Sequence, residues 1–316
     1  MQAFVTMSLP GFNACLIDRP GIPSDLWSSS SQPAGDETFE LQVYDLTFRL
    51  RGIPSEVLPH LDRLRMGPSE IPSRRYLDID AIQSPHPQFN SPELTGLTYT
   101  INFDVGEDAI TFFGYYFAAR FFLNAKTFQL FLAPSDPETL ARDVENFLRV
   151  STSLYLQFEQ VFLFHSSAVC TGDHTFGFFG PHAAGKSTIA LLAPEGTLVL
   201  GDDLNALVVK SARVHIISVP FPSEVTTLRP IVDRPVTALF RLVQSPEFGF
   251  KALSHSRKFA ALIGSMPVLN KMPDCMPLLK ASIETLIDTV PICELHFSKR
   301  KEIYPWIEAN LHSMPR

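Results

Sequence analysis

The chain has 316 residues, enough for two domains at roughly 100–200 residues each. Hydrophobic residues make up 45% of it and charged residues 19%, the balance of a globular protein with a substantial apolar core. The 26 Lys and Arg against 33 Asp and Glu give a net charge of −7, which disfavours binding to nucleic acid and to an anionic membrane surface.

The spacing of the cysteines and the N-terminal sequence indicate the cellular compartment in which the protein is expected. The cysteines are scattered and form no C-x-x-C pair: Cys15, Cys170, Cys275 and Cys293. This disfavours a disulfide framework and a cysteine-rich zinc site, and it suits a reducing cytoplasm. Residues 1–20 lack the basic start and the long apolar run of a signal peptide. The longest apolar stretch, residues 109–123, contains Arg120 and is too short to span a bilayer, so we expect a cytoplasmic protein.

Residues 1–133 are predicted to form a β-rich N-terminal domain, because they are rich in proline, serine and aromatics and show little helical periodicity. Residues 38–52 alternate well enough for one or two strands, and residues 97–117 are typical of a hairpin. The apolar stretch 109–123 is expected to supply one or two buried strands. Residues 53–92 carry seven prolines, which predicts that regular elements there are short.

A domain boundary is predicted near residue 134, where a helix should begin. Ser135, with Glu138 three residues later, has the pattern of a capping box. Pro137 would lie in the first helical turn, where the missing N–H removes no hydrogen bond. Apolar residues at steps of three and four then predict one long helix, or two, up to about Gln160. Residues 134–316 are therefore predicted to form the second domain.

The second domain mixes predicted strands and helices along the chain, as expected for an α/β fold. Residues 161–170 and 174–180 predict two strands around a tight turn, and a short helix from Gly185 must end before Pro194. Further strands are expected at 197–203, 204–209, 213–219, 235–243 and 291–297, and helices at 277–290 and 302–311.

A phosphate-binding loop is predicted between the second of these strands and the short helix. The residues Gly180, Pro181, His182, Ala183, Ala184, Gly185, Lys186 and Ser187 fit the pattern G-x-x-x-x-G-K-[ST]. In such a loop backbone N–H groups cradle phosphates, the lysine reaches the β- and γ-phosphates, and the hydroxyl binds Mg²⁺. We therefore expect residues 180–188, ending at Thr188, to bind ATP. His182 either points outward or adds a donor to the γ-phosphate.

Two carboxylates follow the loop lysine closely, since Asp202 and Asp203 come 16 and 17 residues after it. Phosphoryl transfer needs a metal held against the phosphates and a group that orients or deprotonates the acceptor hydroxyl. Neighbouring side chains on a strand point opposite ways, so each aspartate can take one of these jobs. A solvated turn is the simpler alternative. His165, at the end of an apolar strand, is by itself more typical of a structural histidine than of a catalytic one.

The order of these features resembles that of a known kinase family. A histidine 21 residues before the loop lysine, the loop, and the aspartate pair lie within residues 164–203. This run is similar to the catalytic domain of the HPr kinase/phosphorylase family, which shares its nucleotide fold with phosphoenolpyruvate carboxykinases. The resemblance implies an α/β fold: a phosphoenolpyruvate-carboxykinase-like P-loop kinase domain preceded by a β-rich N-terminal domain.

The resemblance also implies residue roles. Asp202 would act as the base on the acceptor hydroxyl, and Asp203 would bind Mg²⁺ together with Ser187. His165 would hold or tune the first aspartate, and Lys186 would act on the phosphates. Two further positions come from the same resemblance at residues that lie beyond the pair: Glu224 near the metal and Arg229 on phosphate.

Three departures from the family bear on the acceptor. A glycine- and arginine-rich signature after the aspartates is not recognisable, the residue after His165 is serine rather than glycine, and residues 1–133 do not resemble the regulatory domain of the bifunctional enzymes. HPr itself and the reverse reaction are therefore disfavoured. We expect an ATP- and Mg²⁺-dependent kinase that acts on a hydroxyl, a serine of a peptide or protein or a small molecule, with residues 1–133 contributing acceptor recognition or subunit contacts.

Two other functions stay open from the sequence. A nucleotide-binding regulator without turnover is favoured by His182 and Ala183 in the loop, and disfavoured by the aspartate pair, because binding alone needs only one metal carboxylate. A carboxykinase-like enzyme acting on a small acid is the third interpretation, although such chains are longer and carry metal-binding His and Lys positions that this sequence does not show. Homo-oligomer formation is likewise left open.

Overall fold

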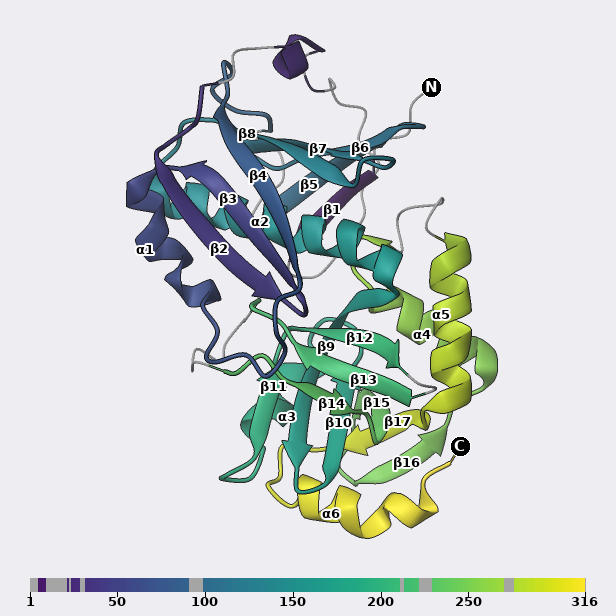
Figure 1. The fold of residues 1–316 in the computed structure, drawn as a ribbon. Coiled ribbons are helices and arrows are strands. Elements are labelled where there is room, and N and C mark those ends of the chain that lie inside the picture. The colour runs from purple at the N-terminus through teal and green to yellow at the C-terminus, as the bar shows by residue number, and fades with distance from the viewer. Residues whose placement is uncertain are drawn as a thin grey trace. The chain divides into compact units, whose positions relative to one another are not determined.

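The computed structural model describes residues 5–9, 22, 24–28, 32–90, 99–210, 213–221, 229–269 and 276–315. The chain divides into two compact units. The first unit comprises Met1–Arg65 and Ser73–Thr152, and the second comprises Met66–Pro72 and Ser153–Arg316. Each unit contains a mixed sheet, so the chain is a mixed α/β protein, as predicted at this level (Figure 1).

The sheet of the first unit has, in the described residues, eight strands in the order β1-β5-β6-β7-β8-β4-β3-β2. They are β1 (Val5–Leu9), β2 (Glu37–Val43), β3 (Leu46–Ile53), β4 (Arg75–Gln83), β5 (Tyr99–Val105), β6 (Ala109–Phe113), β7 (Phe117–Phe122) and β8 (Thr127–Leu132). β4 pairs in parallel with β3 and β8, and the other neighbours are antiparallel. The strands predicted at 38–52 and the hairpin at 97–117 are confirmed as β2–β3 and β5–β6.

Strand β4 corrects the prediction that residues 53–92 hold only short elements. The elements before it are indeed short: η2 (Ser55–Val57), α1 (Leu58–Leu61) and η3 (Asp62–Leu64). β4 itself runs for 9 residues, with Leu77, Ile79 and Ala81 buried in alternation. The prolines of this region flank the strand and leave residues 73–84 free of them. Proline blocks a strand only where it falls, so its position matters more than its number.

Helix α2 (Pro137–Leu156) supplies a large part of the first unit's core. The Phe147 ring of α2 lies 5.9–6.1 Å from the ring centroids of Phe112, Phe117 and Phe128 on the sheet. The helix begins differently from the predicted capping box: Asp136, not Ser135, accepts a hydrogen bond at 2.9 Å from a backbone N–H, that of Thr139. Asp136 directly precedes the helical proline, which is where a capping side chain must lie.

The sheet of the second unit has nine strands in the described residues, ordered β14-β13-β12-β9-β10-β15-β17-β16, with β11 beside β9. They are β9 (Val161–Thr171), β10 (His174–Phe179), β11 (Leu198–Gly201), β12 (Leu204–Lys210), β13 (Arg213–Ser218), β14 (Asp233–Pro235), β15 (Ala238–Gln244), β16 (Gly249–Ala252) and β17 (Ile292–Phe297). β10, β15 and β17 run parallel to one another, and the other pairs are antiparallel.

Helices cover both faces of this second sheet, and side chains of successive strand residues alternate between them. Phe178 packs with Ile189 of α3 (Lys186–Leu191) and Tyr304 of α6 (Ile303–Asn310). Its neighbour Phe179 belongs to the cluster on the other face, with Ile283 of α5 (Met276–Thr289) and residues of α4 (His255–Gly264). Figure 1 draws α4 and α5 together at one side of the sheet and α6 at another.

The expected helices 277–290 and 302–311 are confirmed as α5 and α6, whereas α4 and β16 were not predicted. Short 3₁₀ turns complete the described elements: η1 (Ser24–Ser28), η5 (Gln157–Glu159) and η8 (Leu311–Ser313). No helix in the described part of the chain is both long enough and apolar enough to cross a membrane.

Candidate functional site

The predicted loop lies between a strand and a helix, as expected. β10 ends at Phe179 and α3 begins at Lys186. Gly185, just before the helix, has φ = 101°, and a Cβ atom there would lie 2.7 Å from the Phe297 ring, so both backbone conformation and space favour glycine. Ala183 has φ = 61°, uncommon for a residue with a side chain, and its carbonyl accepts a hydrogen bond from Gln244 Nε2 at 2.8 Å.

Lys186 lies inside the curve of this loop. Its side chain donates hydrogen bonds to the carbonyl oxygens of Gly180 and Pro181, both at 3.1 Å. The residue is only 8% exposed, and this burial lowers the pKa of the ammonium group, while the negative charge of Asp203 opposes the shift. A buried cation therefore stands at the first turn of α3, within the electrostatic reach of one of the two aspartates.

The other predicted loop residues differ in exposure. Pro181, His182 and Ala183 are exposed at the tip, and Ala184 is buried against the apolar cluster that contains α3 and α6. Ser187 and Thr188, which follow the lysine, are half-buried.

The aspartate pair lies at a bend opposite the middle of β9. β11 pairs with Ala168–Cys170 of β9, and β12 pairs with Val161–His165, so Asp202 and Asp203 connect two strands that follow one another along the same partner. The backbone N–H of Ser166 donates to the carbonyl oxygen of Asp203 at 3.1 Å, which fixes the bend against β9. The pair directly follows a strand, as predicted.

The two aspartates have different partners. Asp203 is half-buried, and its Oδ1 lies 3.2 Å from Nδ1 of His165. Asp202 is 1% exposed, and its Oδ1 lies 3.7 Å from NH1 of Arg229. The resemblance implied that His165 holds the first aspartate, and the structure instead places it beside the second. The register explains this, because Leu204 pairs with His165 and Asp203 is its immediate neighbour.

Arg229 is the most deeply buried arginine of this site, at 5% exposure. Its NH1 atom is buried and has no hydrogen-bond partner among the described residues. Burial lowers the pKa of the guanidinium group and the charge of Asp202 raises it, but an arginine stays charged in either case. Buried donors are nearly always hydrogen-bonded. A buried guanidinium N–H without an acceptor is therefore suited to an anion.

One predicted ligand cannot be placed, because Glu224 lies outside the described residues. Within the described ranges, no cluster of three or more His, Cys, Asp or Glu side chains is arranged to hold a metal ion. Mg²⁺ sites at phosphate groups commonly use only one or two carboxylates, with phosphate oxygens and water completing the shell. Asp203 offers one such carboxylate, and Ser187 offers a hydroxyl.

A cleft of about 390 Å³ adjoins the loop, and nothing in the sequence marked it. Gly185 and Thr188 form its loop side, and residues 244–246 and 297–299 form the rest. The two outer segments follow β15 and β17, the strands parallel to β10, and the N–H of Ser245 donates to the carbonyl of Phe297 at 2.8 Å. The position of the cleft could have been predicted from the order of the strands, because ligands bind at the carboxyl ends of parallel strands.

No protein-family model matches the chain, and no curated protein matches its sequence. Among solved structures, part of the chain is similar to the HPr(Ser) kinase/phosphatase from Coxiella burnetii, with 12% sequence identity over 48% of this chain and 94% of that chain and a TM-score of 0.26. At this identity and score the likeness assigns no role to any residue.

Proposed function

We propose that the second unit is an ATP- and Mg²⁺-dependent kinase with a phosphoenolpyruvate-carboxykinase-like fold. It would transfer the γ-phosphoryl group to a hydroxyl, a serine of a peptide or protein or a small molecule. The observation that best supports this is the convergence of Lys186, Asp203 and His165, which come from three separate segments. A buried cation, a carboxylate and a histidine beside it are the groups that phosphoryl transfer uses to position reactants and stabilise charge.

The loop residues fit the phosphates of ATP. Gly180 and Gly185 have positive φ, and Gly185 has no room for a side chain, so the backbone is open to a close approach. The Lys186 ammonium can exchange its two carbonyl bonds for phosphate oxygens. NH1 of Arg229, which has no hydrogen-bond acceptor among the described residues, is a second donor suited to an anion. Bound Mg·ATP would supply the transferable phosphoryl group and the charge of the metal ion.

The difference in exposure between the two aspartates favours Asp203 as the carboxylate that contacts the reacting groups. It is half-buried, interacts with Lys186 and is oriented by His165, so it and Ser187 are the proposed metal ligands. Asp202, proposed as the base by resemblance, is enclosed beside Arg229. Asp202 can act as the base only if the acceptor hydroxyl reaches its carboxylate past the side chain of Arg229. If the hydroxyl does not reach it, the role of Asp202 is to orient Arg229.

The cleft beside the loop is proposed to hold the nucleoside. It begins at Gly185 and Thr188, directly beside the residues proposed for the phosphates. Phe297 and Pro246 give it apolar walls, and Lys299 and the neighbouring serines supply polar groups. This mixture of apolar surface and a few polar groups is typical of small-molecule sites.

Nucleotide titration of a Lys186→Ala variant tests the proposal. Loss of a charged hydrogen-bond donor should weaken Mg·ATP binding on the order of 10- to 100-fold in calorimetry. Lys251→Ala is the matched control, because Lys251 is an exposed lysine of β16 and should leave the affinity unchanged. Equal affinity in the wild type and Lys186→Ala would show that the loop does not bind nucleotide.

A nucleotide-binding regulator without turnover is the second candidate. The enclosure of Asp202 beside Arg229 favours it, since a base that cannot reach an acceptor leaves a binding site only. Single-turnover measurements with radiolabelled ATP separate the two functions. Transfer of phosphate to a serine-containing acceptor identifies a kinase, release of phosphate to water shows turnover without naming the acceptor, and tight binding with neither identifies the regulator.

A further inference from the structure

The segment Met66–Pro72 belongs to the second unit, although the residues on both sides of it belong to the first. It lies along residues 229–234. The N–H of Gly67 donates to the carbonyl oxygen of Arg229 at 2.7 Å, and the N–H of Glu70 donates to that of Ile231 at 2.9 Å. Ser69 and Ile231 form an isolated parallel bridge. The segment thus pairs, through one isolated bridge, with the stretch that carries Arg229.

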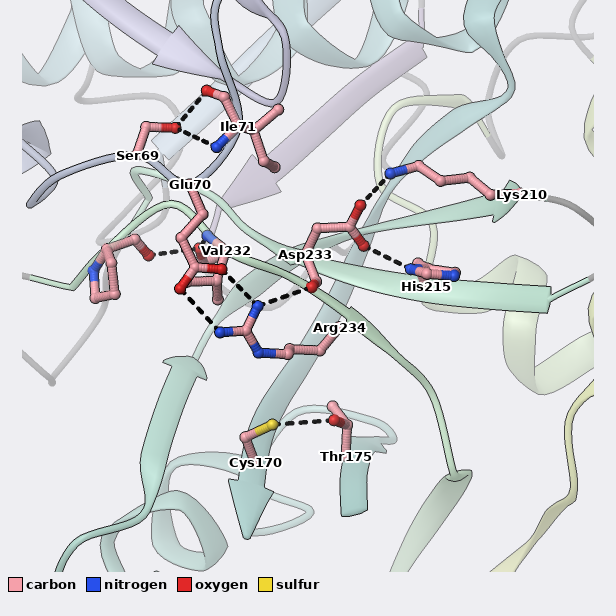
Figure 2. Close-up of polar contacts among 12 residues, drawn as sticks. Ser69, Glu70, Ile71, Cys170, Thr175, Lys210, His215, Val232, Asp233 and Arg234 are labelled. Carbon is pink, nitrogen blue, oxygen red and sulfur yellow. Dashed lines mark hydrogen bonds and ion pairs between the residues drawn. The ribbon is translucent and has the colours of Figure 1, made fainter. Parts of the chain in front are cut away.

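Side chains reinforce this pairing (Figure 2). Arg234 donates through both terminal nitrogens to the two carboxylate oxygens of Glu70, at 2.7 and 2.9 Å. Such a two-bond contact fixes direction as well as distance. Ser69 bonds both the carbonyl and the N–H of Ile71 through its hydroxyl, which closes the turn before the segment ends.

The stretch 229–235 is anchored on its other side as well. Asp233 accepts hydrogen bonds from Lys210 of β12 and pairs with His215 of β13, the latter at 2.7 Å (Figure 2). The Ser218 hydroxyl donates to the carbonyl of Pro230 and accepts from the N–H of Val232, both at 2.8 Å. Residues 229–235 therefore run between β13 and the 66–72 segment. Arg229 lies at the start of this stretch, before the residues that bond to β12 and β13.

The 66–72 segment also contacts Arg229 itself. The Gly67 bond ends on the main chain of Arg229 itself, and a Cβ atom on Gly67 would lie 3.4 Å from the same carbonyl oxygen. The guanidinium group meets Asp202 at 3.7 Å, beyond hydrogen-bond distance. Because no hydrogen bond joins these two side chains, the backbone of Arg229 helps to fix how its guanidinium group approaches Asp202.

We infer that the 66–72 segment is a positioning element: it holds the backbone of Arg229, and through Arg229 it keeps the Asp202 carboxylate in its orientation. This inference rests on the proposed function for its catalytic consequence. Glu70 and Gly67 are positioning residues, since they act through Arg229 and touch no reacting atom. The exposed Glu70–Arg234 pair adds little to stability by itself, so a purely structural role predicts small effects.

A pair of substitutions at one position isolates the Gly67 hydrogen bond. Gly67→Pro removes the N–H that donates to Arg229, whereas Gly67→Ala keeps it and places a Cβ atom at an ordinary contact distance. With the full chain, we expect Gly67→Pro to lower the rate of ATP hydrolysis on the order of tenfold and to weaken Mg·ATP binding as well, because Arg229 is one of the donors proposed for the phosphates. Gly67→Ala should behave as wild type in both measurements.

A double-mutant cycle shows whether the effect runs through Arg229. In an Arg229→Ala background, Gly67→Pro should have almost no further effect on the rate, because the group that it positions is gone. The inference is wrong if Gly67→Pro lowers the rate of ATP hydrolysis equally in the wild-type and Arg229→Ala backgrounds. It is also wrong if Gly67→Ala lowers the rate as much as Gly67→Pro, or if Gly67→Pro leaves the rate unchanged.

The inference and the proposed function can fail separately. If the wild-type chain neither binds Mg·ATP nor hydrolyses it, the proposed function fails. The same cycle is then measured by urea unfolding, with Gly67→Pro combined with Asp202→Asn. These residues do not touch, so coupling between them supports positioning through Arg229, and strictly additive changes in the free energy of unfolding overturn it.

Discussion

Both units bury carboxylates, but they surround them differently. In the first unit, Asp143 on α2 accepts a hydrogen bond from the backbone N–H of Tyr116, and Glu145 pairs with Arg149 at 2.8 Å and with Arg63 at 2.5 Å. In the second unit, Asp202 faces Arg229 at 3.7 Å, and the NH1 donor has no acceptor among the described residues. The carboxylates of the first unit thus make short contacts with their donors, whereas the distance between Asp202 and Arg229 exceeds that of a hydrogen bond.

The strongest way to break this comparison is to neutralise one carboxylate in each unit. Asp203→Asn should reduce ATP hydrolysis on the order of 10²–10⁴-fold, because a group that acts in the transition state is lost. Its unfolding midpoint should stay close to that of the wild type. Asp202→Asn tests the other half of the pair, and loss of the Mg²⁺ dependence in one variant but not in the other identifies the metal ligand. If neither substitution affects turnover, the kinase proposal fails.

In the first unit, we expect neutralising a carboxylate to lower stability and to leave the rate of ATP hydrolysis unchanged. Asp143→Asn should destabilise the chain by about 1–3 kcal/mol, since a buried charged acceptor of a backbone hydrogen bond is replaced by a neutral one. Urea unfolding measures this loss, and the hydrolysis rate of the folded fraction should not change. A variant of unchanged stability with impaired turnover would show that α2 takes part in the reaction.

The cleft that we propose for the nucleoside offers a sharper comparison within the second unit. Ser298→Trp should fill the cleft and weaken ATP binding about tenfold, which corresponds to about 1.4 kcal/mol. Its affinity for inorganic triphosphate, which has no nucleoside, should not change. Ser313→Trp, at an exposed serine, is the control. If wild-type protein binds ATP and triphosphate equally well, the cleft makes no contribution.

The smallest expected effect concerns the buried lysine. Burial lowers the pKa of Lys186 below the ordinary lysine value of 10.5, so the folded chain releases this proton at a lower pH than the unfolded chain. Stability should therefore rise with pH between the lowered pKa and 10.5. Lys186→Met should abolish this rise in urea unfolding at about pH 7 and about pH 10. A rise that persists in the variant would assign it to another group.

Local patterns in the sequence identified the elements that depend on local chemistry. The spacing from Gly180 to Ser187 predicted a strand, a loop and a helix, and all three are present because glycine positions and a helix start are properties of neighbouring residues. The contact between His165 and Asp203 could not be obtained in this way. It depends on the register of β12 against β9, which involves residues about 40 positions apart and which no local pattern encodes.

Long-range pairing explains the remaining differences as well. Residues 66–72 contain Pro68 and Pro72 and show no strand periodicity, so their bridge to Ile231 had no signal in the sequence. The cleft likewise needs the turns after β15 and β17 to meet beside Gly185. Counting prolines failed for β4 for the opposite reason, because the count ignored where they lie. The roles of the site residues stay predictions until the variants above are measured.

The assignment of Met66–Pro72 to the second unit makes that unit discontinuous along the gene. A fragment that encodes only residues 153–316 would carry the loop, both aspartates and Arg229, yet it would lack the segment that pairs with Ile231. On the ribosome this segment emerges long before its partner at residue 231, so the unit can close only after most of the chain has been made. Recombination that exchanged the N-terminal half for an unrelated domain would remove it. A synthetic peptide of residues 66–72 added to the fragment is then the simplest complementation experiment.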